Sequence, residues 1–118
     1  MTLVDTSVWV DHLRHRNAAL GDLLGDDQVA CHPFVIGELA CGYLRNRHEI
    51  LSLLAALPQA DVVEHPEALA FLATHGLPGT GLGWIDVHVL ASAVLARTNL
   101  WTLDGPLRRA AQRLHVAY

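Results

Sequence analysis

The hydrophobic positions at the start of the chain form a short run that stops at an acid. Leu3 and Val4 precede Asp5, and two hydroxyl residues, Thr6 and Ser7, follow before an apolar pattern that no longer alternates. This pattern predicts a strand that delivers Asp5 to its carboxyl end, and a helix that Thr6 and Ser7 open as capping residues. In an open α/β sheet, ligands bind outside the carboxyl ends of the strands, so Asp5 faces a potential site. A simple helix cap is the alternative interpretation of Asp5.

Strand-like and helix-like segments then alternate along the chain. Pro33 and Pro66 stand where the first turn of a helix tolerates proline, and Gly105-Pro106 begins the last helix. The pattern predicts further helices over residues 17–24, 33 to about 45, about 47–56, 66–74 and 84–97, and strands over residues 28–31, 61–64 and 99–103, while residues 116–117 could form a terminal strand. This alternation predicts an α/β fold in which helices wrap a parallel sheet.

Length and composition narrow the class of protein. We expect residues 1–118 to form one domain with its own core, because an apolar content of 52% and a net charge of −4 exclude a disordered chain. No uninterrupted apolar stretch reaches the roughly 18 residues of a membrane span. Asp5 also stands where a signal peptide would need a basic region and an apolar run. We therefore expect a cytoplasmic protein with no membrane partner.

Lysine is absent, and all eight basic residues are arginine. This excludes a P-loop, which needs a lysine on the phosphates, and a phospho-acceptor receiver domain. The glycine-rich segment 76–83 follows a helix rather than a strand, so it indicates a flexible connection beside a site. The two cysteines, Cys31 and Cys41, make no disulfide framework, and together with His32 and His48 they lack the spacing of a zinc site.

Four of the twelve acids lack an ordinary surface explanation. The other eight acids have such an explanation. Asp11 has Arg14 and His15 as helical neighbours, and seven acids have loop, cap or surface explanations: Asp22, Asp26, Asp27, Glu49, Asp61, Glu64 and Glu67. The four that remain are Asp5, Glu38, Asp86 and Asp104.

Asp5 and Asp104 each follow a strand and precede a helix, which predicts that both leave a parallel sheet at the same edge. Glu38 and Asp86 are expected to project from helices into apolar surroundings, because their neighbours three and four positions away are nonpolar. Capping explains Asp86 least well, since its helical face is the most clearly apolar. If the four acids converge, their mutual repulsion forbids full ionisation unless a cation neutralises them.

Oxygen ligands favour a hard cation, Mg²⁺ or Mn²⁺, over zinc. A metal held by carboxylates activates water and stabilises charge on a phosphoryl oxygen, which is what phosphodiester cleavage requires. The structural alternative for each acid is a cap or a local salt bridge.

Four motifs resemble those of the PIN-domain ribonucleases, and most of all the VapC toxins of bacterial type II toxin–antitoxin systems. They are Leu3-Val4-Asp5-Thr6-Ser7-Val8-Trp9, Ile36-Gly37-Glu38-Leu39, Trp84-Ile85-Asp86-Val87-His88-Val89-Leu90-Ala91-Ser92-Ala93 and Trp101-Thr102-Leu103-Asp104. Each motif alone is weak, but they span nearly the whole chain in family order, and together they are specific.

The resemblance implies a three-layer α/β/α PIN-like fold with a central parallel sheet, usually dimeric, that cleaves RNA. It also implies that Asp5, Glu38, Asp86 and Asp104 are the catalytic residues and the ligands of Mg²⁺ or Mn²⁺, and that a VapB-type antitoxin is the partner. The hydroxyls of Thr6, Ser7 and Thr102 fall where the family often orients an acid or a water. Many members carry a further acid where this chain has Gly105, Pro106 and Leu107, and that departure argues against a complete second metal site.

The charge balance is compatible with an RNA substrate. Twelve acids less the four site acids leaves eight, which the eight arginines match, so the rest of the molecule is neutral. Seven arginines in three groups are candidate phosphate contacts, although a solvated surface explains each one singly: Arg14 and Arg16; Arg45 and Arg47; and Arg108, Arg109 and Arg113.

Two alternative functions stay open. None of the eight histidines is assigned a catalytic role, and His88 points to a different helical face from Asp86. A metal-independent ribonuclease would use a histidine pair as acid and base. A nuclease-dead PIN-like interaction module is the other alternative, against which the presence of all four acids argues.

Overall fold

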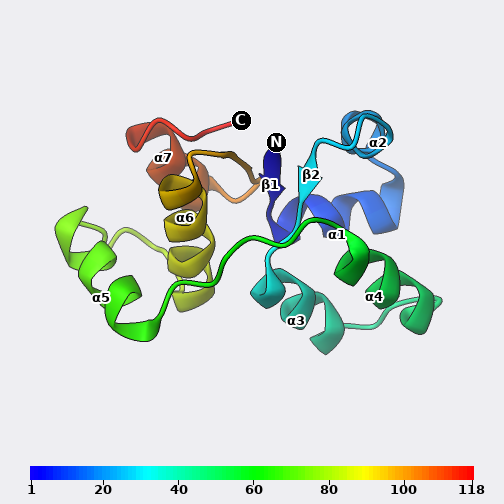
Figure 1. The fold of residues 1–118 in the computed structure, drawn as a ribbon, viewed down its shortest axis with the longest axis horizontal. Helices are drawn as coiled ribbons and strands as arrows, with labels where there is room; N and C mark the ends of the chain where they lie inside the picture. The colour runs from blue at the N-terminus through cyan, green and yellow to red at the C-terminus, as the bar shows by residue number, and fades with distance from the viewer.

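The computed structural model describes all 118 residues and contains a parallel sheet of three strands. These are β1 (Thr2–Val4), β2 (Val29–Ala30) and β3 (Asn99–Trp101), in the order β2-β1-β3. Thr2 is in register with Val29 on one side and with Asn99 on the other. The first strand along the chain is therefore the central one, and its carboxyl end lies beside that of β3 (Figure 1).

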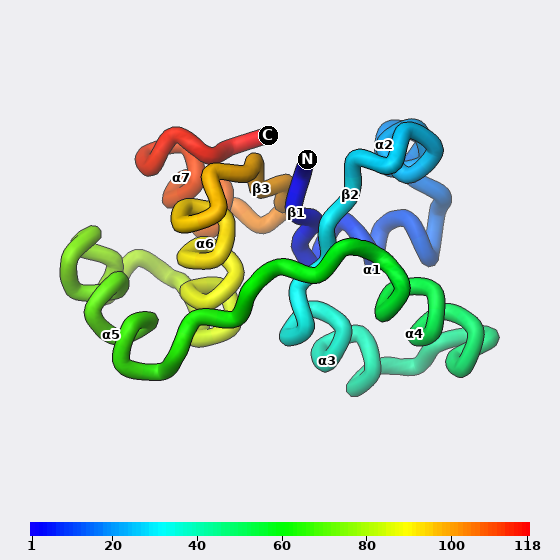
Figure 2. Tube along the Cα trace, in the orientation of Figure 1, coloured from blue at the N-terminus to red at the C-terminus, as the bar shows by residue number.

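Seven helices cover the sheet in a three-layer α/β/α arrangement. They are α1 (Thr6–His15), α2 (Ala18–Gly25), α3 (Pro33–Cys41), α4 (Arg47–Ala56), α5 (His65–Thr74), α6 (Trp84–Ala96) and α7 (Gly105–Arg113). Helices α1 to α4 lie to the right of the sheet in Figure 1, and α5 to α7 lie to the left. The segment between α4 and α5 runs across the molecule and joins the two groups (Figure 2). No helix is both long and apolar enough to cross a membrane.

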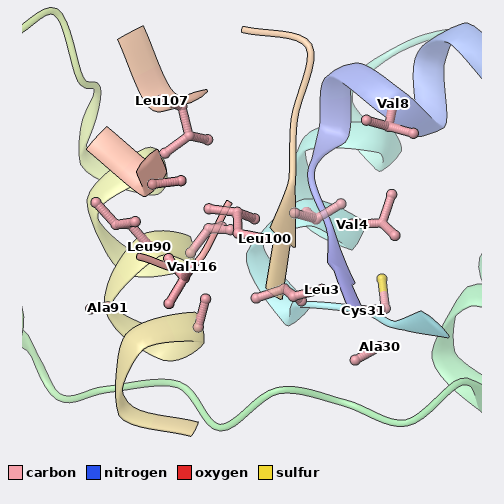
Figure 3. Close-up of a cluster of buried hydrophobic side chains, with 14 of the residues drawn as sticks. Leu3, Val4, Val8, Ala30, Cys31, Leu90, Ala91, Leu100, Leu107 and Val116 are labelled. Carbon is pink, nitrogen blue, oxygen red and sulfur yellow. The ribbon is translucent and has the colours of Figure 1, made fainter. Parts of the chain in front are cut away.

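The core is one cluster on both faces of the sheet, and part of it lies where α6 and α7 pack against the strands. Leu3 of β1 and Leu100 of β3 face Leu90 of α6, and Leu107 of α7 belongs to the same cluster (Figure 3). Every residue of α6 from Val87 to Ala93 is buried. A helix that is buried on all sides is held in place by packing, so α6 fixes the position of the residues in its first turn.

The prediction of an α/β fold with a parallel sheet is confirmed, but two predicted elements are wrong. Residues 61–64 form no strand. The chain pairs with the sheet earlier, through a single bridge between Gln59 and Cys31, and then turns away so that the Asp61 carbonyl accepts a hydrogen bond from Ser92 Oγ at 2.7 Å. The third helix ends at Cys41 rather than near Arg45, because Gly42 adopts an extended conformation.

The open interpretation of residues 116–117 is resolved by one bridge between Leu100 and Ala117. Leu100 N–H donates to the Val116 carbonyl at 2.7 Å, and Tyr118 N–H donates to the Leu100 carbonyl at 3.0 Å. The end of the chain thus runs parallel to β3 and covers its outer edge.

Candidate acidic site at the sheet edge

Asp5 is buried at the carboxyl end of β1, with 4% of its surface exposed. Asp5, rather than Thr6 or Ser7, is the N-cap of α1, which was the alternative interpretation of this residue, and its backbone N–H donates to the Trp101 carbonyl of β3 at 2.9 Å. Three hydrogen bonds reach the same carboxylate oxygen, Oδ2: from Ser7 N–H at 3.4 Å, Ser7 Oγ at 2.8 Å and Thr102 Oγ1 at 2.7 Å. These bonds fix the carboxylate and leave Oδ1 to other contacts.

Asp104 stands two residues beyond Thr102, at the carboxyl end of β3. Its Oδ2 accepts from Leu107 N–H at 3.1 Å, which makes it the N-cap of α7, and its own N–H donates to Thr102 Oγ1 at 3.0 Å. Thr102 therefore bridges Asp5 and Asp104. The prediction that these two acids leave the sheet at the same edge is confirmed by the parallel pairing of β1 with β3.

Asp86 is half-buried in the first turn of α6, and its Oδ2 accepts from Gly83 N–H at 2.9 Å. Asp86 stands three positions beyond Gly83 and caps the N-terminus of α6. The expectation that capping is the weakest explanation of Asp86 is therefore wrong. Burial raises the pKa of Asp86 most, and the negative charges of Asp5, Asp104 and Glu38 raise it further, against the lowering effect of the Gly83 N–H. Asp86 is thus within electrostatic reach of each of the other three candidate acids.

Glu38 lies on α3 and is exposed, so the prediction that it projects into apolar surroundings is wrong. The buried residues of α3 are Val35, three positions before Glu38, and Leu39, one position after it, and the helix ends at Cys41. Thr6 Oγ1 donates to Glu38 Oε1 at 2.7 Å and holds the carboxylate toward the start of α1.

Hydroxyl and backbone groups, and no arginine, donate the hydrogen bonds that these four carboxylates accept. The candidate metal ligands are therefore all carboxylate oxygens, and no basic side chain compensates their negative charge. Such ligands suit a hard divalent cation. No three metal-ligating side chains stand close enough together to enclose one ion. A cation bound here would therefore keep much of its water shell, as Mg²⁺ does.

A groove of about 410 Å³ adjoins this site and shares Thr6 and Glu38 with it. Arg14 and Arg45, two of the candidate phosphate contacts, line the groove. Tyr43 also lines it and is 93% exposed. Tyr43 was not predicted as a functional residue, because it falls within the predicted third helix. The signal in the sequence is an aromatic residue next to Gly42, the glycine at which that helix ends.

Two further arginine candidates, Arg109 and Arg113, belong to a different pocket. Arg109 and Arg113 of α7 line a smaller pocket of about 230 Å³ with Thr80 and Pro106. Arg113 donates to the His75 carbonyl, so at least part of its role is to hold the end of α5.

Comparison with known proteins identifies the fold family. The family model of the PIN domain matches residues 2–113, which include all four acids. The chain belongs to the PIN-domain family. This PIN domain is also 48% identical to Ribonuclease VapC32 of Mycobacterium tuberculosis, in strains CDC 1551 and H37Rv, over 99% of its own length and 95% of each relative. The resemblance that the four motifs carry is thereby confirmed.

Proposed function

We propose that this PIN domain is a metal-dependent endoribonuclease and the toxin of a toxin–antitoxin pair. The observation that carries the proposal is a group of four carboxylates whose hydrogen-bond donors are hydroxyl and backbone groups and include no arginine. Burial raises the pKa of Asp86 most, and the charges of the other three acids raise it further. The ribonucleases to which the chain is similar support the substrate class. Mg²⁺ or Mn²⁺ is the proposed cofactor, and Asp5, Glu38, Asp86 and Asp104 are the proposed ligands and catalytic residues.

The bound cation would activate water and stabilise negative charge on the phosphoryl oxygen. The chain's own residues fix the carboxylates that would receive it. Ser7 and Thr102 occupy Asp5 Oδ2 and so present Oδ1, and the Gly83 N–H orients Asp86 from the rigid start of α6. Thr6 holds the exposed Glu38 across from them. Each carboxylate is thus oriented by its own hydrogen bonds before any ligand binds, which reduces the reorganisation that catalysis requires.

The proposed partners are RNA, a VapB-type antitoxin and a second copy of this chain. The names of the relatives and the high apolar fraction motivate the last two. Large hydrophobic side chains remain exposed on several helices, including Leu53, Leu69 and Leu95. Light scattering at micromolar concentration without antitoxin tests the homodimer, and a monomer there contradicts it.

The test of the proposed function is Asp86→Asn, because asparagine nearly preserves shape and can still accept the Gly83 N–H. Cleavage of RNA in Mg²⁺ or Mn²⁺ and growth inhibition in the host should be lost. In chelator the variant should be at least as stable as the parent, since a charge that the other three acids repel is gone. Asp22→Asn, an exposed acid on α2, is the matched control and should cleave like the parent.

Three outcomes separate the competing functions. A destabilised but active Asp86→Asn variant would overturn the assignment, because a buried charge pair typically costs about 3–5 kcal/mol when broken. Cleavage that survives chelator would indicate a histidine-based ribonuclease. No cleavage by the parent under any metal condition would indicate an interaction module.

A further inference from the structure

The groove beside Glu38 is built from α1 and from the loop that follows α3. Arg14 comes from the last turns of α1, whereas Tyr43 and Arg45 come from the loop between Gly42 and Asn46. Arg47 Nη1 donates to the Gly42 carbonyl at 3.3 Å and joins the two ends of this loop. The volume of the groove, about 410 Å³, lies within the range of small-molecule sites, roughly 300–1,000 Å³.

Tyr43 is the most exposed large hydrophobic residue of the chain, at 93%. A tyrosine in that position gains little from packing within the chain, so its aromatic surface is available to a ligand. The PIN domain's other tyrosine, Tyr118, packs instead on Trp101, with ring centroids 4.9 Å apart.

The charges around the groove favour an anion that also reaches the acidic site. Arg14 and Arg45 are both exposed. The one carboxylate of the groove, Glu38, accepts a hydrogen bond from Thr6 and not from either arginine. Two arginines next to an exposed aromatic ring match the combination that holds single-stranded nucleic acid, in which phosphates pair with cations and bases stack on rings.

We propose that this groove is a subsite for one unpaired nucleotide next to the scissile phosphate of the RNA substrate. Tyr43 stacks on the base, and Arg14 and Arg45 hold the adjoining phosphates. The inference rests on the proposed ribonuclease function and adds the residues that select the cleavage position. Because the faces of a paired base are covered within a helix, the subsite accepts only nucleotides that are unpaired.

The first experiment measures the affinity for a short, labelled, unstructured RNA by fluorescence anisotropy in chelator, which removes the proposed metal and so stops metal-dependent cleavage. Tyr43→Ala and Tyr43→Leu should each weaken binding by about fivefold or more, since stacking on one base contributes about 1–3 kcal/mol. Tyr43→Phe keeps the ring and should bind like the parent. A leucine variant that binds like the parent would overturn stacking, because it would show that any apolar side chain suffices.

The second experiment measures the salt dependence of the same binding. Arg45→Ala and Arg14→Ala should each reduce the slope of log affinity against log salt by about 0.7, the value for one phosphate contact on a single strand. Arg97→Ala is the matched control, because Arg97 is exposed at the far end of α6 and should leave the slope unchanged. Unchanged slopes for both groove arginines would overturn their role.

Cleavage kinetics in Mg²⁺ or Mn²⁺ separate this inference from the proposed function. If the parent cleaves RNA, Tyr43→Ala should raise KM for an unpaired substrate by about fivefold or more and change kcat little. A parent that does not cleave contradicts the ribonuclease function, while the anisotropy results still judge the groove. A Tyr43→Ala variant that keeps RNA affinity but fails to bind a co-expressed antitoxin would assign the groove to a protein and overturn the proposal.

Discussion

Thr102 shows how one buried hydroxyl organises two charged neighbours. Its Oγ1 donates to Asp5 Oδ2 at 2.7 Å and accepts from Asp104 N–H at 3.0 Å. Ser7 Oγ adds a contact to the same carboxylate, lies 3.2 Å from Thr102 Oγ1 and accepts from Leu103 N–H at 2.9 Å. These hydrogen bonds satisfy the buried carboxylate oxygen, which offsets the cost of burying Asp5.

His32 is another buried polar residue, and it lies at the start of α3, next to Ser92 of α6. Its Nδ1 accepts from Phe34 N–H at 2.9 Å, so the proton is on Nε2, which lies 3.1 Å from Ser92 Oγ. Ser92 in turn donates to the Asp61 carbonyl. This chain of bonds joins α3, α6 and the segment between α4 and α5. Burial, with a smaller effect from His88, lowers the pKa of His32 to about 4.

The lowered pKa of His32 predicts that the protein loses stability in mild acid. The unfolded state binds a proton near pH 6.5 and the folded state only near pH 4, so stabilisation is complete above about pH 6.5 and is lost as the pH falls toward about 4. At about pH 5 the loss should be about 2 kcal/mol relative to neutral pH. Urea unfolding at a series of pH values measures it.

The control for this prediction replaces a solvated histidine. His32→Asn retains an acceptor for the Phe34 N–H and should flatten the pH dependence, whereas His15→Asn, on the exposed face of α1, should leave it as in the parent. An unchanged slope in His32→Asn would assign the acid sensitivity to other groups.

At the scale of the elements, the sequence predicted best where one local signal decided the structure. The run of Leu3, Val4 and Asp5 predicted the first strand and the start of α1, and Pro33 and Pro66 marked the starts of α3 and α5. The prediction failed where tertiary contacts decided. Residues 61–64 have a strand-like composition, but the bond from Ser92 draws the Asp61 carbonyl to α6 and away from the sheet.

The site was predictable to the same extent and for the same reason. Strand ends placed Asp5 and Asp104 together, and the resemblance supplied the hydroxyl residues beside them. The cap that Asp86 makes and the exposure of Glu38 depend on how the glycine-rich segment and the end of α3 are arranged, which periodicity does not reveal. The roles of the four acids stay predictions.

Gly81 belongs to the connection that positions Asp86. Its φ is +87°, and a Cβ there would lie 3.3 Å from Cβ and Cγ of Pro106 at the start of α7. We expect Gly81→Ala to reduce the free energy of unfolding by about 1–3 kcal/mol, through left-handed backbone strain and displacement of Pro106. It should also lower cleavage, because the loop leads directly to the Gly83 N–H that holds Asp86.

Gly79→Ala is the matched control for Gly81→Ala. Its φ of +76° imposes the same kind of backbone strain, but nothing lies within 4 Å of the added Cβ. It should cost less stability, about 1–2 kcal/mol, and leave cleavage near that of the parent. Urea midpoints and kcat for the two variants measure the difference, and equal effects on both would argue against a positioning role for the contact with Pro106.

At the scale of the whole molecule, negative charge is concentrated rather than spread. The net charge of −4 equals the contribution of the four site acids, since the other eight acids match the eight arginines. The folded state therefore carries a local repulsion at the sheet edge, which the unfolded chain relieves by separating the four carboxylates. Stability and metal binding should be coupled through this one region.

That coupling predicts that Mg²⁺ or Mn²⁺ raises the melting temperature of the parent protein. An ion that binds only the folded state at about 100 times its Kd adds about 2.7 kcal/mol. For a chain of this size, each kcal/mol should shift Tm by about 3–6 °C. Asp86→Asn should begin with a Tm in chelator equal to or above that of the parent and should gain much less from either ion, while Asp22→Asn should respond as the parent does. Calorimetry that detects no binding of either ion at millimolar concentration, together with a Tm that neither ion changes, would contradict a metal site built from these four acids.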